Sequence, residues 1–203
     1  GLVLLAALLG GLLPALGGPK DWKDAFSRQD QQPYGTYLIY ENLPALFPQS
    51  ELTEVKQNLF DQLVFTYPEQ TAYLFINETL PLTPEEADEL YEFVERGNIA
   101  LLALREFPGL LERALRIETA TSAVARRDSL KLQWEGPGPT GGGFHFPRFN
   151  MPTYLRTYDP GSSTVLARSK QGEVRVLKVT VGEGFFLLVT EPRMLSNYYL
   201  RHP

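Results

Sequence analysis

The first apolar stretch of the chain, Leu2 to Gly18, contains no charged or polar side chain. A helix that spans a bilayer needs about 20 such residues, so the stretch is almost long enough. We therefore predict a transmembrane anchor at residues 1–18. The alternative is a cleaved signal peptide that ends at the small residues around Ala15-Leu16-Gly17. Residues 19–32 are polar and charged, which predicts a juxtamembrane tether, and residues 33–203 follow as one domain.

The stretch PYGTYLIYENLPALFP, residues 33–48, has apolar side chains at helical spacing and predicts a helix with one buried face. The side chains expected on that face are Thr36, Ile39, Tyr40, Leu43, Leu46 and Phe47. Gly35 costs little in a first turn, because the N–H groups there have no helical partner. Pro44 removes one internal hydrogen bond, so we expect the helix to bend or to split at that point.

A strand, a helix and a second strand follow in the middle of the chain. Residues 72–76 and 99–104 are continuous apolar runs, which are typical of buried strands. Between them, Thr83-Pro84-Glu85-Glu86 has the signature of a capping box, with proline at the first helical position. Gly97 stands where this helix should end. Short connections in this order predict a parallel βαβ unit.

The second half of the chain changes pattern, because short β-rich runs alternate there with Gly, Pro and Ser turns. We expect strands at residues 130–134, 153–158, 164–168, 173–181 and 185–190. The glycines of Val181-Gly-Glu-Gly184 suit a hairpin turn between the last two strands. The fold class that follows is α/β, with a parallel sheet as its core and a β-rich C-terminal extension.

The composition excludes several kinds of chemistry. Without any cysteine, the chain has no disulfide, no thiolate metal site and no cysteine nucleophile. A net charge of −5 gives no general attraction to nucleic acid. Residues 136–141 match G-x-G-x-x-G, but two prolines interrupt the pattern, so we predict a loop rather than a dinucleotide site. Neither His145 nor His202 has a second ligand at metal spacing. We therefore assign no catalytic residue, no metal ligand and no cofactor.

A resemblance to a known family rests on five blocks: PYGTYLIYENLPALFP, YLFIN, TPEEADELYEFVERGNIALLAL, VGEGFFLLVTEP and LSNYYL. In order and spacing they resemble the bacterial family catalogued as domain of unknown function 4350, from about Trp22 to the end of the chain. The resemblance implies an inner-membrane protein whose periplasmic domain has a flavodoxin-like, class I glutamine-amidotransferase-like fold. It also implies an envelope protein complex linked to a MoxR-type AAA+ ATPase. Glutamine amidotransferases use a cysteine after a strand, and the corresponding turn here reads Arg105-Glu106-Phe107, so glutaminase activity is excluded.

The candidate site follows from the predicted parallel sheet, since ligands of such sheets bind beyond the carboxyl ends of the strands. The residues that we place at this rim are Tyr34, Gly35, Asn77, Arg105, Glu106 and Glu191. Gly35 would let a ligand or partner approach the backbone closely. The structural alternative is plain packing, with Arg105 paired to Glu106 or Glu191.

From these observations we expect a membrane-anchored, extracytoplasmic domain that binds a partner or ligand without catalysis. The alternative is a hydrolase that uses Arg105 and nearby carboxylates in a crevice at the same rim.

Overall fold

The structure is a computed structural model that describes residues 20–55, 63, 69–122, 129–136, 143–147 and 153–201. The predicted transmembrane anchor, residues 1–18, lies outside these ranges. None of the helices in the described part of the chain combines the length and the apolar content that crossing a bilayer requires.

The described helices are α2 (Tyr37–Leu46), α4 (Pro84–Glu95), α5 (Gly109–Leu115), the 3-10 helix η2 (Pro192–Leu195) and α6 (Asn197–Arg201). The described strands are β1 (Ala72–Thr79), β2 (Ile99–Glu106), β3 (Glu118–Thr121), β4 (Ser129–Trp134), β5 (Gly143–Pro147), β6 (Thr153–Thr157), β7 (Ser163–Ser169), β8 (Val174–Val181) and β9 (Gly184–Val189).

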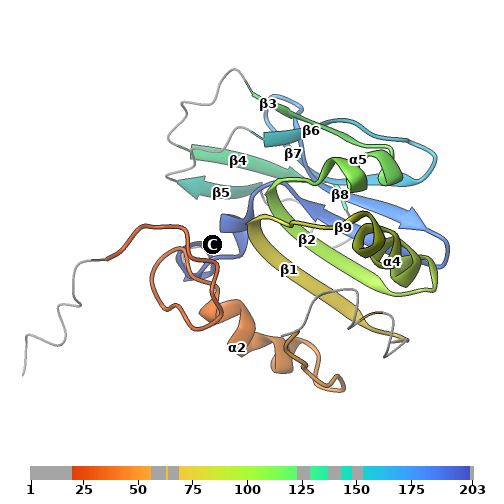
Figure 1. The fold of residues 1–203 in the computed structure, drawn as a ribbon. Coiled ribbons are helices and arrows are strands. Elements are labelled where there is room, and N and C mark those ends of the chain that lie inside the picture. Colours follow the sequence, from red (N-terminus) through yellow and green to blue (C-terminus); the bar gives the residue numbers. More distant parts are fainter. Residues whose placement is uncertain are drawn as a thin grey trace, which may run out of the picture.

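The strands form one mixed sheet that curls into a half-barrel (Figure 1). Its order is β1-β2-β9-β8-β7-β4-β5, and β6 pairs with both β3 and β8. Only the pairs β1–β2 and β2–β9 are parallel, while every other described pair is antiparallel. The expectation of a flavodoxin-like or class I glutamine-amidotransferase-like parallel core with a separate β-rich extension is therefore wrong.

The reason for the difference lies in the short connections of the second half. Parallel neighbours need a crossover of a dozen or more residues, whereas a tight turn returns the chain antiparallel. The turns at Gly172 and Gly182 have left-handed φ angles of 82° and 56°, and they join β7 to β8 and β8 to β9. The predicted hairpin at Val181-Gly-Glu-Gly184 is confirmed. Because β9 then pairs with β2, the β-rich half continues the same sheet instead of extending it as a separate unit.

The βαβ unit in the middle of the chain is confirmed. Strands β1 and β2 are parallel neighbours, and α4 connects them. The side-chain oxygen of Thr83 accepts a hydrogen bond from the Glu86 N–H at 3.2 Å, and Glu86 Oε2 accepts one from the Thr83 N–H at 2.9 Å. Gly97, with φ of 102°, follows the C-cap residue Arg96.

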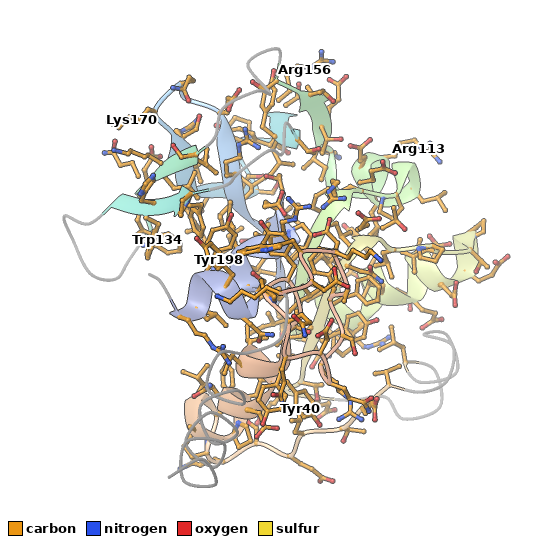
Figure 2. All side chains as sticks on the ribbon, turned by 90° about the vertical axis from the view of Figure 1, so that its left-hand side faces the viewer. Tyr40, Arg113, Trp134, Arg156, Lys170 and Tyr198 are labelled. Carbon is orange, nitrogen blue, oxygen red and sulfur yellow. The ribbon has the colours of Figure 1, made fainter. Side chains whose placement is uncertain are left out.

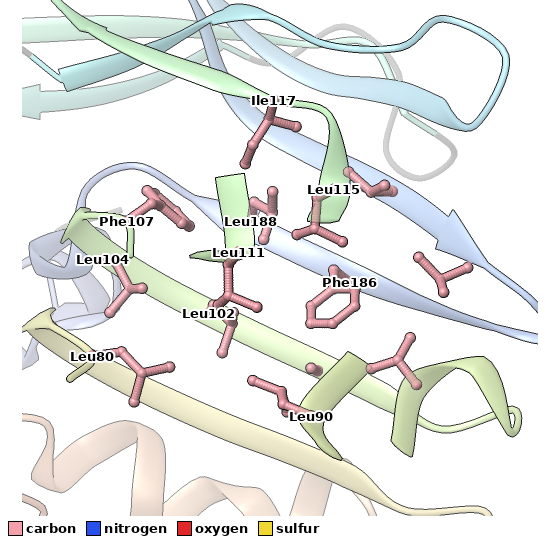
Figure 3. Packing of buried hydrophobic residues seen from close by; sticks show 14 of the residues in the cluster. Leu80, Leu90, Leu102, Leu104, Phe107, Leu111, Leu115, Ile117, Phe186 and Leu188 are labelled. Atoms are coloured by element: carbon pink, nitrogen blue, oxygen red, sulfur yellow. The ribbon is translucent and has the colours of Figure 1, made fainter. Parts of the chain in front are cut away.

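The helix face of the sheet carries the larger core. Side chains from α4 and α5 pack on β2 and β9, as Figure 3 shows for Leu90, Leu102, Leu111, Phe186 and Leu188. All five are fully buried. The opposite face holds a second cluster that includes Ala103, Val176, Val189 and Met194. Met194 comes from η2, so the C-terminal segment covers this second face beside the strand ends.

Helix α2 is exposed more than its apolar pattern predicts. Thr36 is buried at the N-cap, but Leu46 is 64% exposed and Phe47 is 53% exposed. None of the residues Tyr37–Leu46 is buried, so the predicted buried face is wrong for the helix itself. The helix contacts α6 rather than lying along the sheet, which leaves its C-terminal end away from the core. Pro44 lies inside the helix, which continues to Leu46 without splitting.

Candidate functional site

The carboxyl ends of the three parallel strands meet at one edge of the sheet. Arg105 is the penultimate residue of β2, Glu78 holds the same place in β1, and Glu191 comes shortly after β9. Side chains alternate between the two faces of a strand. Ala103, two residues before Arg105, belongs to the cluster opposite α4 and α5. Arg105 therefore points to the face that η2 and the N-terminal segment cover.

Two arginines converge on one carboxylate at this edge. Arg193 Nε and Nη2 donate to Asp24 Oδ1 and Oδ2, both at 2.6 Å, in a two-pronged geometry. Arg105 Nη2 donates to Asp24 Oδ2 at 2.8 Å, and its Nη1 donates to Glu78 Oε1. We call Asp24, Glu78, Arg105, Glu191 and Arg193 the ion-pair hub. A guanidinium fork matches the two oxygens of a carboxylate, so this geometry is a strong form of the interaction.

The charges of the hub determine the protonation of Asp24. Burial raises the pKa of this carboxyl, but hydrogen bonds and charge from Arg193 and Arg105 outweigh burial and hold its pKa below the ordinary value. Asp24 is therefore a carboxylate across the physiological range. Its side chain is 14% exposed, and those of Arg105 and Arg193 are 21% and 17% exposed, so the hub reaches the protein surface.

Glu191 is the buried member of the hub. It is 0% exposed, and its Oε1 accepts a hydrogen bond from the Arg193 N–H at 2.9 Å at the start of η2. Its Oε2 has no hydrogen-bond partner among the described residues. Burial raises the pKa of Glu191 to about 7, although Arg105 and Arg193 act in the opposite direction. This carboxyl is accordingly the group of the hub that titrates near neutral pH.

Tyr34 and the aromatic residues around it join the two terminal segments. The guanidinium of Arg193 lies over the Tyr34 ring, 4.5 Å from its centroid. Trp22 meets Tyr34 and Tyr198 edge-on, with ring centroids 5.5 and 5.2 Å apart. Tyr198 lies near the centre of Figure 2, with the N-terminal segment beside it. The aromatic rings thus line the hub on the side that faces α6.

Gly35 lies at a close approach between two parts of the backbone. A Cβ atom at this position would lie 2.1 Å from the backbone oxygen of Asp30. The Gly35 carbonyl accepts a hydrogen bond from the Asn197 N–H at 2.9 Å, and Asn197 Nδ2 donates to the carbonyls of Asp30 and Gln32 at 2.8 Å. The backbone therefore approaches another part of its own chain at Gly35, and the glycine is required for this turn.

Of the six predicted site residues, four gather at this edge and two do not. Tyr34, Arg105 and Glu191 contact the hub or belong to it, and Gly35 shapes the turn beside it. Asn77 and Glu106 each lie one residue along the strand from a hub residue, so alternation directs them to the helix face. Arg105 pairs with Asp24 and Glu78 rather than with Glu106 or Glu191.

Sequence reasoning missed Asp24 and Arg193. Asp24 belongs to the stretch predicted as a tether, and charged residues in such a stretch carry no signal of a tertiary partner. Arg193 follows Glu191-Pro192, and an acidic residue before proline is a recognisable start of a short helix. That pattern predicts the turn of η2 without predicting where the arginine points. In the described part of the chain, no three His, Asp or Glu side chains gather as a metal site.

Most of the chain matches one known protein family. The family described as "Domain of unknown function (DUF4350)" matches residues 28–203. The chain belongs to this family. Arg105, Glu191 and Arg193 lie inside the region matched to domain of unknown function 4350, and Asp24 lies four residues before it. No curated protein matches the chain.

Solved structures share the fold at low identity. The N-terminal domain of mmIFT52 is 12% identical with a TM-score of 0.60, and the match covers 89% of this chain and 87% of that one. Exo-beta-1,4-mannosidase Op5Man5 from Opitutaceae bacterium strain TAV5 is 17% identical with a TM-score of 0.54. That match covers 90% of this chain but only 31% of the mannosidase. At these identities the likeness concerns the fold alone.

Proposed function

We propose that this member of domain of unknown function 4350 is a non-catalytic binding domain of a bacterial envelope complex, and that the ion-pair hub is its binding site. The observation that carries the proposal is the convergence of Arg105 and Arg193 on a single carboxylate at the protein surface. Paired guanidiniums at the carboxyl ends of parallel strands are suited to gripping an anionic group.

We also propose a location for the protein in the cell. Residues 1–18 would anchor it in the bacterial inner membrane, and the described domain would lie in the periplasm. The partner would be a protein of the same membrane, in a complex linked to a MoxR-type AAA+ ATPase. A nucleic-acid partner does not fit a net charge of −5.

A hydrolase is the second candidate, and one observation favours it. Glu191, with a pKa of about 7, has the protonation behaviour of a general acid or base. However, Glu191 is fully buried, and a catalytic group has to reach its substrate. Hydrolysis of a glycoside also needs a second carboxylate beside the scissile bond, and Asp24 is held between two arginines. The mannosidase activity named for the structural neighbour is therefore not part of the proposal.

The test is capture of partner proteins from native membranes with the full-length chain. We expect Arg105→Ala to remain folded and to lose a protein that the wild type captures. Arg156→Ala is the matched control, because Arg156 pairs with Glu118 at the exposed end of β6 and lies far from Tyr198 in Figure 2. Circular dichroism of each variant checks the fold. A folded Arg105→Ala protein that keeps every native partner would disprove the binding role. Turnover of a substrate that depends on Arg105 would favour the hydrolase.

A further inference from the structure

We propose that Asp24 occupies a carboxylate-binding site built by Arg105 and Arg193, and that a carboxylate of the partner takes its place on binding. The inference rests on the proposed function for the identity of the natural occupant. The site itself is defined by the two arginines and can be tested without any partner.

The geometry of Asp24 is that of a bound ligand. Its two oxygens receive three hydrogen bonds from two side chains that come from different elements, β2 and η2. Arg193 is in turn held by its stacking over Tyr34, and Arg105 by its ion pair with Glu78. Both guanidiniums are thus positioned by groups other than Asp24. Neither of these contacts involves Asp24, so removal of Asp24 leaves both groups in place beside the arginines.

The segment that supplies Asp24 has the features of a replaceable occupant. Residues 24–27 belong to neither a helix nor a strand. Phe26, two residues after Asp24, has a left-handed φ of 44°, a conformation that is strained for a bulky side chain. Phe26 itself is buried, and its carbonyl accepts a hydrogen bond from Thr36 Oγ1 at 3.0 Å. The site therefore opens when the Asp24 side chain turns away from the arginines, while Phe26 stays in place. Asp24 also lies outside the region matched to the family, whereas both arginines lie inside it.

The charge balance of the hub favours an anion in the place of Asp24. Without Asp24, Arg193 would keep no ion pair among the described residues, and Arg105 would keep only its pair with Glu78. Both arginine side chains are partly exposed, so a solute or a partner side chain can reach them.

Chemical rescue of Asp24→Ala tests the site directly. The variant should melt below the wild type, and sodium acetate should raise its melting midpoint saturably by several degrees when compared with sodium chloride at equal ionic strength. Acetate should leave the wild type unchanged, because Asp24 already fills the site.

Glu118→Ala is the matched control, since it deprives Arg156 of a carboxylate on the exposed surface without creating an enclosed site. If Asp24→Ala does not fold in sodium chloride, recovery of its circular dichroism spectrum in sodium acetate is the measurement, because acetate then supplies the missing carboxylate.

The response to acetate decides whether Arg105 and Arg193 form a carboxylate-binding site. Rescue of Asp24→Ala that disappears in the double variant with Arg105→Ala supports it. Absence of rescue, or equal rescue of Glu118→Ala, overturns it. Rescue by inorganic phosphate but not by acetate overturns the assignment to carboxylates. If acetate does not rescue Asp24→Ala, the binding role is still judged from the partners that Arg105→Ala and Arg156→Ala capture. If acetate does rescue it but Arg105→Ala keeps every partner, only the binding role is disproved.

Discussion

Replacement of Gly35 by alanine is expected to destabilise the domain by about 3 kcal/mol. The added methyl group would lie 2.1 Å from the Asp30 carbonyl oxygen, a backbone atom that cannot move aside as a flexible side chain can. The turn would have to open, and with it the hydrogen bonds between Asn197 and the segment from Asp30 to Gly35. Urea denaturation of the full-length chain and the variant measures the difference in the free energy of unfolding.

Gly109→Ala is the matched control for this substitution. Gly109 begins α5, and the nearest atom to an added Cβ is the end of the Arg113 side chain at 3.8 Å. Alanine favours a helix more than glycine does, so this variant should be as stable as the wild type or more stable. If Gly35→Ala behaves like Gly109→Ala, the close passage at Gly35 is not part of the native turn.

Glu191→Gln is expected to make the domain more stable than the wild type above pH 7, by about 3 kcal/mol. Burial raises the pKa of Glu191 from 4.5 to about 7 in the folded protein. The folded state therefore binds the proton of the Glu191 carboxyl more tightly than the unfolded state does. The stability that this protonation contributes is complete below pH 4.5. It falls as the pH rises from 4.5 to about 7 and is lost above that range. Glutamine carries no charge to bury, and its oxygen can still accept the hydrogen bond from the Arg193 N–H.

The measurement is the free energy of unfolding of both proteins between pH 5 and 8.5, taken as a difference so that other titrating groups cancel. The difference should grow with pH and level off near pH 8. Groups around Glu191, namely Asp24, Arg105, Arg193 and Tyr199, are unchanged in the variant. Glu85→Gln, in the first turn of α4, is the control, because it removes an exposed carboxylate instead of a buried one. Parallel stability curves for wild type and Glu191→Gln would show that Glu191 is not buried as described.

Local signals in the sequence predict local structure well. The capping box at Thr83, the stop at Gly97 and the hairpin at Gly182 each depend on residues within a few positions of one another, and each is present. The order of the strands does not follow in this way. Whether β9 pairs with β2 depends on contacts between residues more than 80 positions apart, and the apolar runs of parallel and antiparallel strands look alike when both faces are buried.

For the candidate site, too, the sequence predicts what depends on nearby residues and misses what depends on distant ones. Arg105 and Glu191 could be located because both follow apolar strands, and strand ends are readable from the sequence. The sequence also predicts Asn77 and Glu106 at this rim, because it does not fix which face each residue takes at the end of a strand. Asp24 could not be found, since its partners Arg105 and Arg193 are 81 and 169 positions away. An exposed tether and a docked segment have the same polar composition, and only the tertiary structure distinguishes them.

If Arg105 and Arg193 bind an anionic group of a partner, Asp24 competes with that group for the two guanidiniums. The decisive experiment measures how much partner Asp24→Ala and Arg105→Ala each capture from native membranes, compared with the wild type. Removal of the competitor should increase the amount of partner retained by Asp24→Ala, and removal of the ligand-binding group should decrease it for Arg105→Ala. If the two folded variants lose the same partner to the same extent, the ion pairs only hold the terminal segment in place, and the account is contradicted.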